Sequence, residues 1–215
     1  MAELADALDA NFEGKEMLRQ MLIRKAPKWG NDDDYVDELA ADAARIFCDE
    51  VAKYRNTRGG VYRPGVYSVS ANVPLGLHVG PLPNGRKSRT PLADGVAPVH
   101  GCDWEGPTAI AKSVAKLDHE KITNGTILNM KFLPKLLESE GGKRKLADLI
   151  QTYFAMGGWH IQFNVVSAGM LREAQQEPEK HKGLIIRVAG YSAFFVELDK
   201  AVQDDIIDRT EIARF

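Results

Sequence analysis

The chain has 215 residues, of which 44% are hydrophobic and 27% are charged, with a formal net charge of −2 at pH 7. This composition is typical of a soluble globular protein, and the length suits a single domain over residues 1–215. The near-neutral charge argues against binding to nucleic acid or to an anionic membrane surface. No apolar run is long enough to cross a bilayer and the N-terminus is acidic, so we expect a cytoplasmic protein.

Cysteine and histidine are too sparse for a metal centre. The chain has two cysteines, Cys48 and Cys102, and five histidines that are spread singly. Two cysteines without metal-ligand spacing fit a reducing compartment better than a disulfide framework. We therefore expect no bound metal ion.

The first predicted helix begins after three consecutive aspartates at residues 32–34, whose carboxylates suit a helix N-terminus. Apolar residues then recur at the spacing of a helix with one buried face. The residues of this predicted face are Val36, Leu39, Ala40, Ala43, Ile46, Phe47, Val51 and Tyr54. We expect the face to lie in the core, with Cys48 beside it as a small buried thiol.

Residues 61–85 are rich in valine, tyrosine, glycine and proline, which predicts a strand followed by an extended loop. A helix is expected over residues 107–117, with Pro107 at its first position. Strands and helices then alternate along the chain. The predicted strands cover residues 125–132, 159–166 and 183–190, and the predicted helices cover residues 143–158, 167–176 and 199–215.

Several end signals support these helices. Gly157 or Gly158 would close the first of them, Ser167 would cap the second, and Pro178 would end it. Alternating strands and helices indicate an α/β fold with parallel strands. The stretches "IQFNVV" and "LIIRVA" are nearly continuous apolar runs, so we expect strands covered on both faces.

Gly190 lies directly after the last predicted strand, where α/β folds collect their functional sites. An isolated glycine there is most often a turn residue that adopts a positive φ angle. Its neighbours favour a functional role, because "RVAGYSAFF" followed by "LDKAVQDDIIDRT" closely resembles the C-terminal signature of the glycyl radical enzymes.

The resemblance extends along nearly the whole chain. The stretches "YSVSANVPLG", "PNGRKS", "TPLADGVAP", "GPTA", "NGTILNMKF" and "HIQFNVVS" are similar to successive blocks of that family, in the same order. An ordered series is far more specific than one short motif. The sequence resembles the dehydratase and carbon–heteroatom lyase branch more than pyruvate formate-lyase.

The resemblance implies an anaerobic radical mechanism with no bound cofactor. A separate activating enzyme, with an iron–sulfur cluster and S-adenosylmethionine, would remove a hydrogen atom from Gly190. The glycyl radical would then oxidise a cysteine to a thiyl radical, which abstracts hydrogen from a small-molecule substrate. Glycine is required because a side chain would crowd the planar radical centre. Solvent must be excluded during catalysis, yet the loop must open for activation.

The implied fold is the C-terminal part of a ten-stranded α/β barrel. Two half-barrels of parallel strands would run antiparallel to each other, with helices outside and the glycine loop in the centre. A partial barrel would leave apolar surface exposed unless a partner covers it.

The resemblance also implies roles for the residues around the glycine. Arg187 would hold the loop through neighbouring carbonyls or a carboxylate, although an arginine at a strand edge could also reach solvent. Tyr67 would bind substrate or be a core aromatic. Gln162 and Asn164 would line the barrel interior or tie neighbouring backbones together. The other loop residues expected to support the radical site are Val188, Ala189, Tyr191 and Ser192.

The sequence departs from the family in lacking a Gly-Cys-x-Glu motif, the setting of the catalytic cysteine. Cys102 is followed by "DWEG", so we interpret it as structural, with a redox role as the alternative. We expect the chain to be the radical-bearing portion of a longer or split enzyme, inactive alone and a homo-oligomer when complete. The alternatives are a spare-part subunit for an oxygen-damaged enzyme and a pyruvate formate-lyase type of portion. A bacterial microcompartment is an alternative location.

Overall fold

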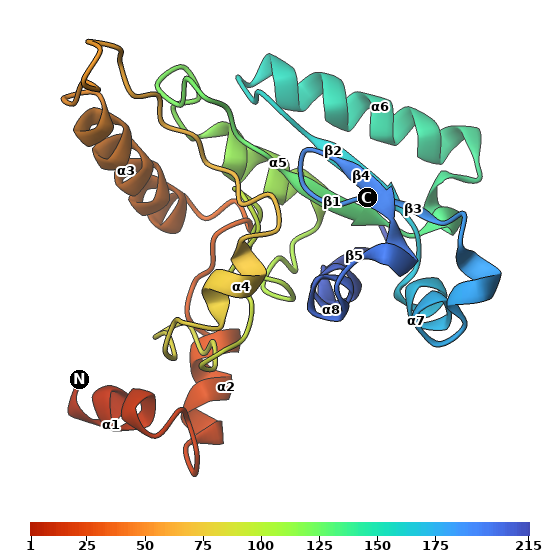
Figure 1. Ribbon diagram of the computed structural model, residues 1–215, viewed down its shortest axis with the longest axis horizontal. Helices are drawn as coiled ribbons and strands as arrows, with labels where there is room; N and C mark the ends of the chain where they lie inside the picture. The colour runs from red at the N-terminus through yellow and green to blue at the C-terminus, as the bar shows by residue number, and fades with distance from the viewer.

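The computed structural model describes all 215 residues, which form a mixed α/β structure (Figure 1). The helices are α1 (Ala2–Asp9), α2 (Glu16–Arg24), α3 (Asp34–Val51), α4 (Asn72–Gly76), α5 (Pro107–Ala115), α6 (Glu140–Ala155), α7 (Ala168–Gln176) and α8 (Lys200–Asp208). The strands are β1 (Asn129–Phe132), β2 (Gln162–Val165), β3 (Ile185–Arg187), β4 (Ser192–Phe194) and β5 (Glu211–Ile212). Short 3-10 helices cover Pro134–Leu137, Pro178–His181 and Phe195–Glu197.

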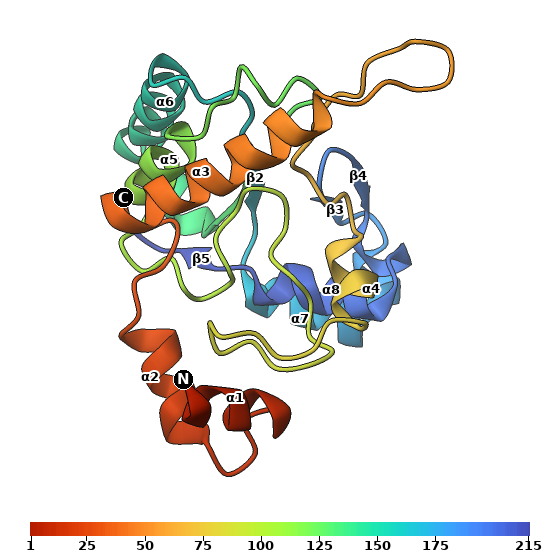
Figure 2. The same cartoon turned by 90° about the vertical axis from the view of Figure 1, so that its left-hand side faces the viewer.

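Three strands form a parallel sheet in the order β2-β1-β5. Helix α6 lies on one side of these strands, and α7 and α8 lie on the other (Figure 1). One hydrophobic core joins β1 to α5 and α6, and a second joins β3 to α7 and α8. Helices α1 and α2 lie at the opposite end of the molecule from α6 (Figure 2). The sheet and its helices therefore form the part of the fold that can position a site.

Most of the predicted helices and strands in the second half of the chain are confirmed. Helix α5 begins at Pro107, and α7 begins after Ser167, whose hydroxyl accepts a hydrogen bond from the Met170 amide at 3.1 Å. Helix α6 is followed by Gly157 in the left-handed region at φ +98°, which ends the helix. Strand β2 is less covered than expected, because its burial alternates and Val165 is exposed.

The prediction of a third parallel strand before Gly190 is wrong. Strand β3 pairs with β4 in an antiparallel hairpin that is separate from the parallel sheet. The reversal occurs because Gly190 adopts φ +83° and the Val188 amide donates a hydrogen bond to the Tyr191 carbonyl at 2.9 Å. A tight turn of this kind sends the chain back along itself.

Two further boundaries differ from the predictions. Residues 61–85 contain isolated bridges and the short helix α4 instead of a strand, because prolines lack the amide donors that a strand needs. The last helix ends at Asp208, and the extended conformation of Arg209 leads into β5. Pairing of Glu211 with Lys131 of β1 replaces the predicted final helical turns.

The segment between α4 and α5 is fixed mainly by one side chain. The Arg86 guanidinium donates hydrogen bonds to the backbone carbonyls of Gly76, Val79, Gly80, Thr90 and Pro91. The carbonyls of Gly80, Thr90 and Pro91 accept no backbone amide, so Arg86 supplies the partner that these groups need. Through these five hydrogen bonds Arg86 links the part of the loop before it to the part after it.

The prediction that the apolar stripe of α3 is buried is also wrong. The helix turns Asp37 and Cys48 inward, and Asp37 accepts hydrogen bonds from Ser113 Oγ at 2.9 Å and Lys116 Nζ at 2.8 Å. This polar pairing with α5 decides which side of α3 packs. Four residues of the predicted face are between 46% and 69% exposed, and they are Leu39, Ile46 and Phe47 on α3 and Tyr54 beyond its end.

No helix combines the length and the apolar character that crossing a membrane requires.

The orientation of α3 predicts that replacing isoleucine by alanine destabilises the protein on α5 but has almost no effect on α3. Ile110→Ala should lower the free energy of unfolding by about 2–5 kcal/mol, because Ile110 is buried and its loss leaves a cavity. Ile46→Ala should change it by less than about 0.5 kcal/mol, because Ile46 is exposed. Urea denaturation followed by circular dichroism measures both values, and equal losses would contradict the packing of α3.

Candidate functional site

Gly190 lies at the turn of the β3–β4 hairpin and is exposed to solvent in this chain. Its φ angle of +83° is one that residues with a side chain rarely adopt. A Cβ atom at this position would lie 3.1 Å from Ile127 Cδ1. Both the backbone conformation and the space therefore favour glycine.

The turn is tied to β2 by two side-chain amides. Gln162 Oε1 accepts hydrogen bonds from the Gly190 amide at 3.2 Å and from Arg187 Nε at 2.9 Å. The side chain of Asn164 bonds both backbone groups of Arg187, accepting at 2.9 Å and donating at 2.7 Å. Gln162 and Asn164 lie two residues apart, so they project from the same face of β2. The structure thus shows these amides tying neighbouring backbones, one of the two alternatives expected for them.

The remaining turn residues divide between the interior and the surface. Val188 and Ala189 are buried, whereas Tyr191 and Ser192 are exposed. Ser192 Oγ accepts a hydrogen bond from Arg187 Nη1 at 3.3 Å. Arg187 therefore contacts both sides of the turn, and its partners are an amide and a hydroxyl oxygen rather than a carboxylate.

A buried cluster of charges lies beneath the turn. Arg209 is 6% exposed and its Nη1 donates to the Val188 carbonyl at 2.8 Å. Its Nη2 lies 3.3 Å from Asp94 Oδ2 and 3.5 Å from Asp205 Oδ2, and both carboxylates are almost completely buried. Asn72 Nδ2 donates to Asp205 at 3.1 Å. A buried cation needs such partners, because an unpaired charge in the interior is strongly unfavourable.

His100 completes this cluster. Its Nε2 lies 3.7 Å from Asp94 Oδ1 and its Nδ1 lies 4.0 Å from Asp205 Oδ1. Burial lowers the pKa of His100, but the neighbouring carboxylates of Asp94 and Asp205 outweigh burial and raise the pKa above its ordinary value. Burial raises the pKa of Asp94, but Arg209 and His100 reverse the shift and hold it below the usual range. For Asp205 burial dominates, and the pKa is raised.

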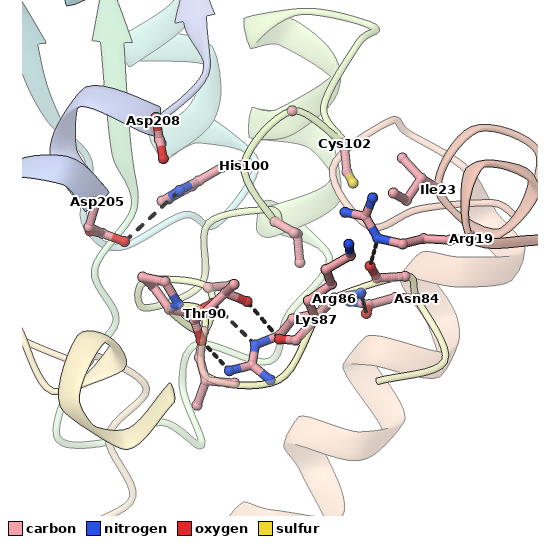
Figure 3. Close-up of a pocket in the computed structure, with 16 residues that line it drawn as sticks. Arg19, Ile23, Asn84, Arg86, Lys87, Thr90, His100, Cys102, Asp205 and Asp208 are labelled. Carbon is pink, nitrogen blue, oxygen red and sulfur yellow. Dashed lines mark hydrogen bonds and ion pairs between the residues drawn. The ribbon is translucent and has the colours of Figure 1, made fainter. Parts of the chain in front are cut away.

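His100 and Asp205 also line a polar pocket of about 470 Å³ (Figure 3). Arg19 and Lys87 contribute positive charge to its wall, and Asp208 contributes negative charge. The charge cluster thus lies between the glycine turn and a pocket at the surface.

The candidate residue Tyr67 lies on an irregular segment next to the one that contacts Gly190. Val66 forms a parallel bridge with Thr126, and the following Ile127 reaches the glycine. The Tyr67 side chain is 41% exposed, and its hydroxyl accepts a hydrogen bond from Asn124 Nδ2 at 2.6 Å. A half-exposed hydroxyl is free to contact a further group on its open side.

Neither cysteine has the surroundings of a reactive thiol. Cys48 and Cys102 are both buried and unpaired. Burial raises the pKa of each thiol, which disfavours the nucleophilic thiolate.

Four residues that hold the turn, or that anchor a neighbour of it, were missed by sequence reasoning. They are Asp94, Asn129, Lys131 and Arg209. The signal for two of them was present, because Asn129 and Lys131 interrupt an apolar strand and buried polar groups need partners. Lys131 is 1% exposed, and its Nζ donates to the Ile207 carbonyl at 2.7 Å, which anchors the end of α8 next to Arg209. Burial lowers its pKa to about 8.

Comparisons with known proteins agree with this geometry. Residues 92–196 match the family described as "Glycine radical", and residues 1–76 match the family described as "Pyruvate formate lyase-like". The first match includes the exposed left-handed Gly190. The chain belongs to the glycyl radical enzyme family. The relatives that it matches include dehydratases and isethionate sulfite-lyases of that family.

Three relatives illustrate the likeness. Probable dehydratase YbiW of Escherichia coli strain K12 is 49% identical, covering 97% of this chain and 27% of that protein. Trans-4-hydroxy-L-proline dehydratase of Clostridioides difficile is 44% identical, and the match covers 98% of this chain and 27% of that protein. The solved structure of the glycerol-bound B12-independent glycerol dehydratase from Clostridium butyricum is 50% identical with a TM-score of 0.95. The match covers 99% of this chain and 27% of that chain. The chain spans about a quarter of the length of the relatives that it matches.

The lowered pKa of Lys131 predicts a pH dependence of stability. Between pH 8 and about 10.5 the unfolded chain still binds the lysine proton that the folded chain has released, so stability rises with pH across this window. Relative to Lys131→Met, the wild-type free energy of unfolding should increase by up to about 3 kcal/mol. Urea titrations from pH 7 to 11 measure the difference, and parallel profiles would contradict a charge buried at this position.

Proposed function

We propose that this chain is the glycyl-radical-bearing portion of a longer or split dehydratase or carbon–heteroatom lyase, with the radical stored on Gly190. The observation that carries the proposal is the match to the "Glycine radical" family over a segment that contains the exposed turn at φ +83°. No side chain has to be displaced for the Gly190 Cα to become planar. The dehydratase relatives favour this branch over the pyruvate formate-lyase alternative.

The remaining portion of the enzyme would supply what this chain lacks. The chain has no Gly-Cys-x-Glu motif, and Gly190 is exposed although a carbon radical needs exclusion of solvent and dioxygen. The parallel sheet would be one part of a ten-stranded barrel of two antiparallel half-barrels, with the glycine turn at its centre. Residues 1–215 would act as one domain within it.

The proposed reaction is a series of hydrogen-atom transfers that begins at Gly190. A separate activating enzyme with an iron–sulfur cluster and S-adenosylmethionine would remove one hydrogen atom from the Gly190 Cα and leave one unpaired electron. The radical would take a hydrogen atom from the thiol of the partner portion, restoring the glycine and forming a thiyl radical. The thiyl would abstract hydrogen from the substrate, which loses its leaving group before the hydrogen is returned.

The residues around Gly190 would have separate roles. Arg187 and Ser192 would fix the turn through their mutual hydrogen bond, and Val188 and Ala189 would anchor it in the core. Tyr67 would use the open side of its hydroxyl to bind a substrate oxygen. The complete enzyme would be a cytoplasmic homo-oligomer or the content of a bacterial microcompartment.

The radical assignment is tested by electron paramagnetic resonance. After anaerobic incubation with an activating enzyme, S-adenosylmethionine and a reductant, the chain should give a doublet, because one α-hydrogen of Gly190 remains coupled to the electron. Gly190→Ala should abolish the signal. Gly183→Ala is the matched control, because Gly183 has open space around it, and should retain the doublet. A doublet that survives in Gly190→Ala would contradict the assignment.

The outer side of α3 is the surface that we expect the partner portion to cover. Its apolar residues are exposed, and contiguous apolar surface marks an interface. Leu39→Glu combined with Ile46→Glu should weaken binding of the separately produced partner portion by about 100-fold or more, because the charges would be buried unpaired. Isothermal titration calorimetry measures the affinity.

The control for this surface is Gln151→Glu on α6, which adds a charge at an exposed polar position and should leave the affinity unchanged. If the double variant bound as tightly as wild type, the partner portion would have to cover a different surface.

A further inference from the structure

The hydrogen bonds around the glycine turn form one closed circuit. Gln162 Oε1 accepts a hydrogen bond from the Gly190 amide, and Gln162 Nε2 donates one to Asn129 Oδ1. Asn129 Nδ2 donates to Asp94 Oδ2, which also lies 3.3 Å from Arg209 Nη2. Arg209 Nη1 returns to the turn at the Val188 carbonyl, at 2.8 Å.

The circuit grips the turn at two backbone groups that lie two residues apart. One is the Val188 carbonyl before the glycine and the other is the Gly190 amide itself. The hairpin has no ladder hydrogen bonds to the parallel sheet, so side chains must set its position relative to β1 and β2. Charged hydrogen bonds in a buried site are strong and directional, and linked bonds support one another.

We propose that Gln162, Asn129, Asp94 and Arg209 are positioning residues that together fix the Gly190 backbone in its left-handed conformation. Asp94, Asn129 and Arg209 act through their neighbours, because none of them forms a hydrogen bond with Gly190. The purpose of the circuit rests on the proposed function, since a stored radical needs a fixed glycine. Its existence does not depend on radical chemistry.

Amide hydrogen exchange of the 215-residue chain, read by nuclear magnetic resonance, tests the circuit without any radical. Asn129→Leu and Arg209→Gln should each accelerate exchange of the Gly190 amide by about 10- to 100-fold, the loss expected for a charged or buried hydrogen bond. Amides of α6, such as that of Tyr153, serve as the internal reference and should not change. The matched control is Arg214→Gln, because Arg214 is exposed on the same C-terminal segment.

A double variant separates a circuit from two independent supports. If the bonds act as one circuit, Asn129→Leu with Arg209→Gln should accelerate exchange by clearly less than the product of the single effects. Multiplying effects would overturn the circuit. An unchanged exchange rate of the Gly190 amide in either single variant would also overturn the circuit. An equal acceleration of exchange at Gly190 and throughout α6 would overturn it as well. If electron paramagnetic resonance detected no radical on Gly190, the hydrogen-exchange results would still hold. The proposed function and the circuit can therefore fail separately.

Discussion

One buried cation, the Arg209 guanidinium, links the glycine turn to the buried carboxylates beneath it. It joins the Val188 carbonyl to two almost completely buried carboxylates, that of Asp94 in the segment before α5 and that of Asp205 four residues earlier on α8. Because the three partners come from the turn after β3, from α8 and from the segment before α5, a single side chain links three parts of the fold. Lys131 supports this arrangement from β1 by binding the end of α8, which fixes the point from which Arg209 extends. Removal of either cation would leave buried acceptors without partners.

The same preference for polar pairing decides which surfaces remain exposed. Asp37 draws one side of α3 onto α5, and the apolar side consequently faces outward. The glycine turn is also tied by polar groups on its inner side and is uncovered on the other. Both exposed features occur in a chain that spans about a quarter of the length of the relatives that it matches.

The sequence predicted the elements whose signals are local. Pro107, Ser167 and Gly157 mark helix ends through their own backbone chemistry, and these were read correctly. Features that depend on long-range pairing were misread. The apolar stripe of α3 resembled a core face, because the side of the helix that packs is decided by the pairing of Asp37 with Lys116, which lies far along the chain. The last helix was predicted too long, because strand pairing with β1 cannot be seen in the residues that form β5. Gly190 was found through its neighbours, whereas Asp94 and Arg209 became visible only when folding brought them together.

Arg86 shows how a segment without helices or strands can still have a fixed shape. Its five carbonyl partners lie on both arms of one loop, and the loop also forms part of the pocket beside His100. Neither arm can shift alone without breaking hydrogen bonds to Arg86, so this guanidinium couples the positions of the two arms. Because Arg86 binds backbone carbonyls, which every residue has, side-chain substitutions elsewhere in the loop should preserve the shape of the pocket. Loss of the Arg86 guanidinium should remove the bonds that hold this shape.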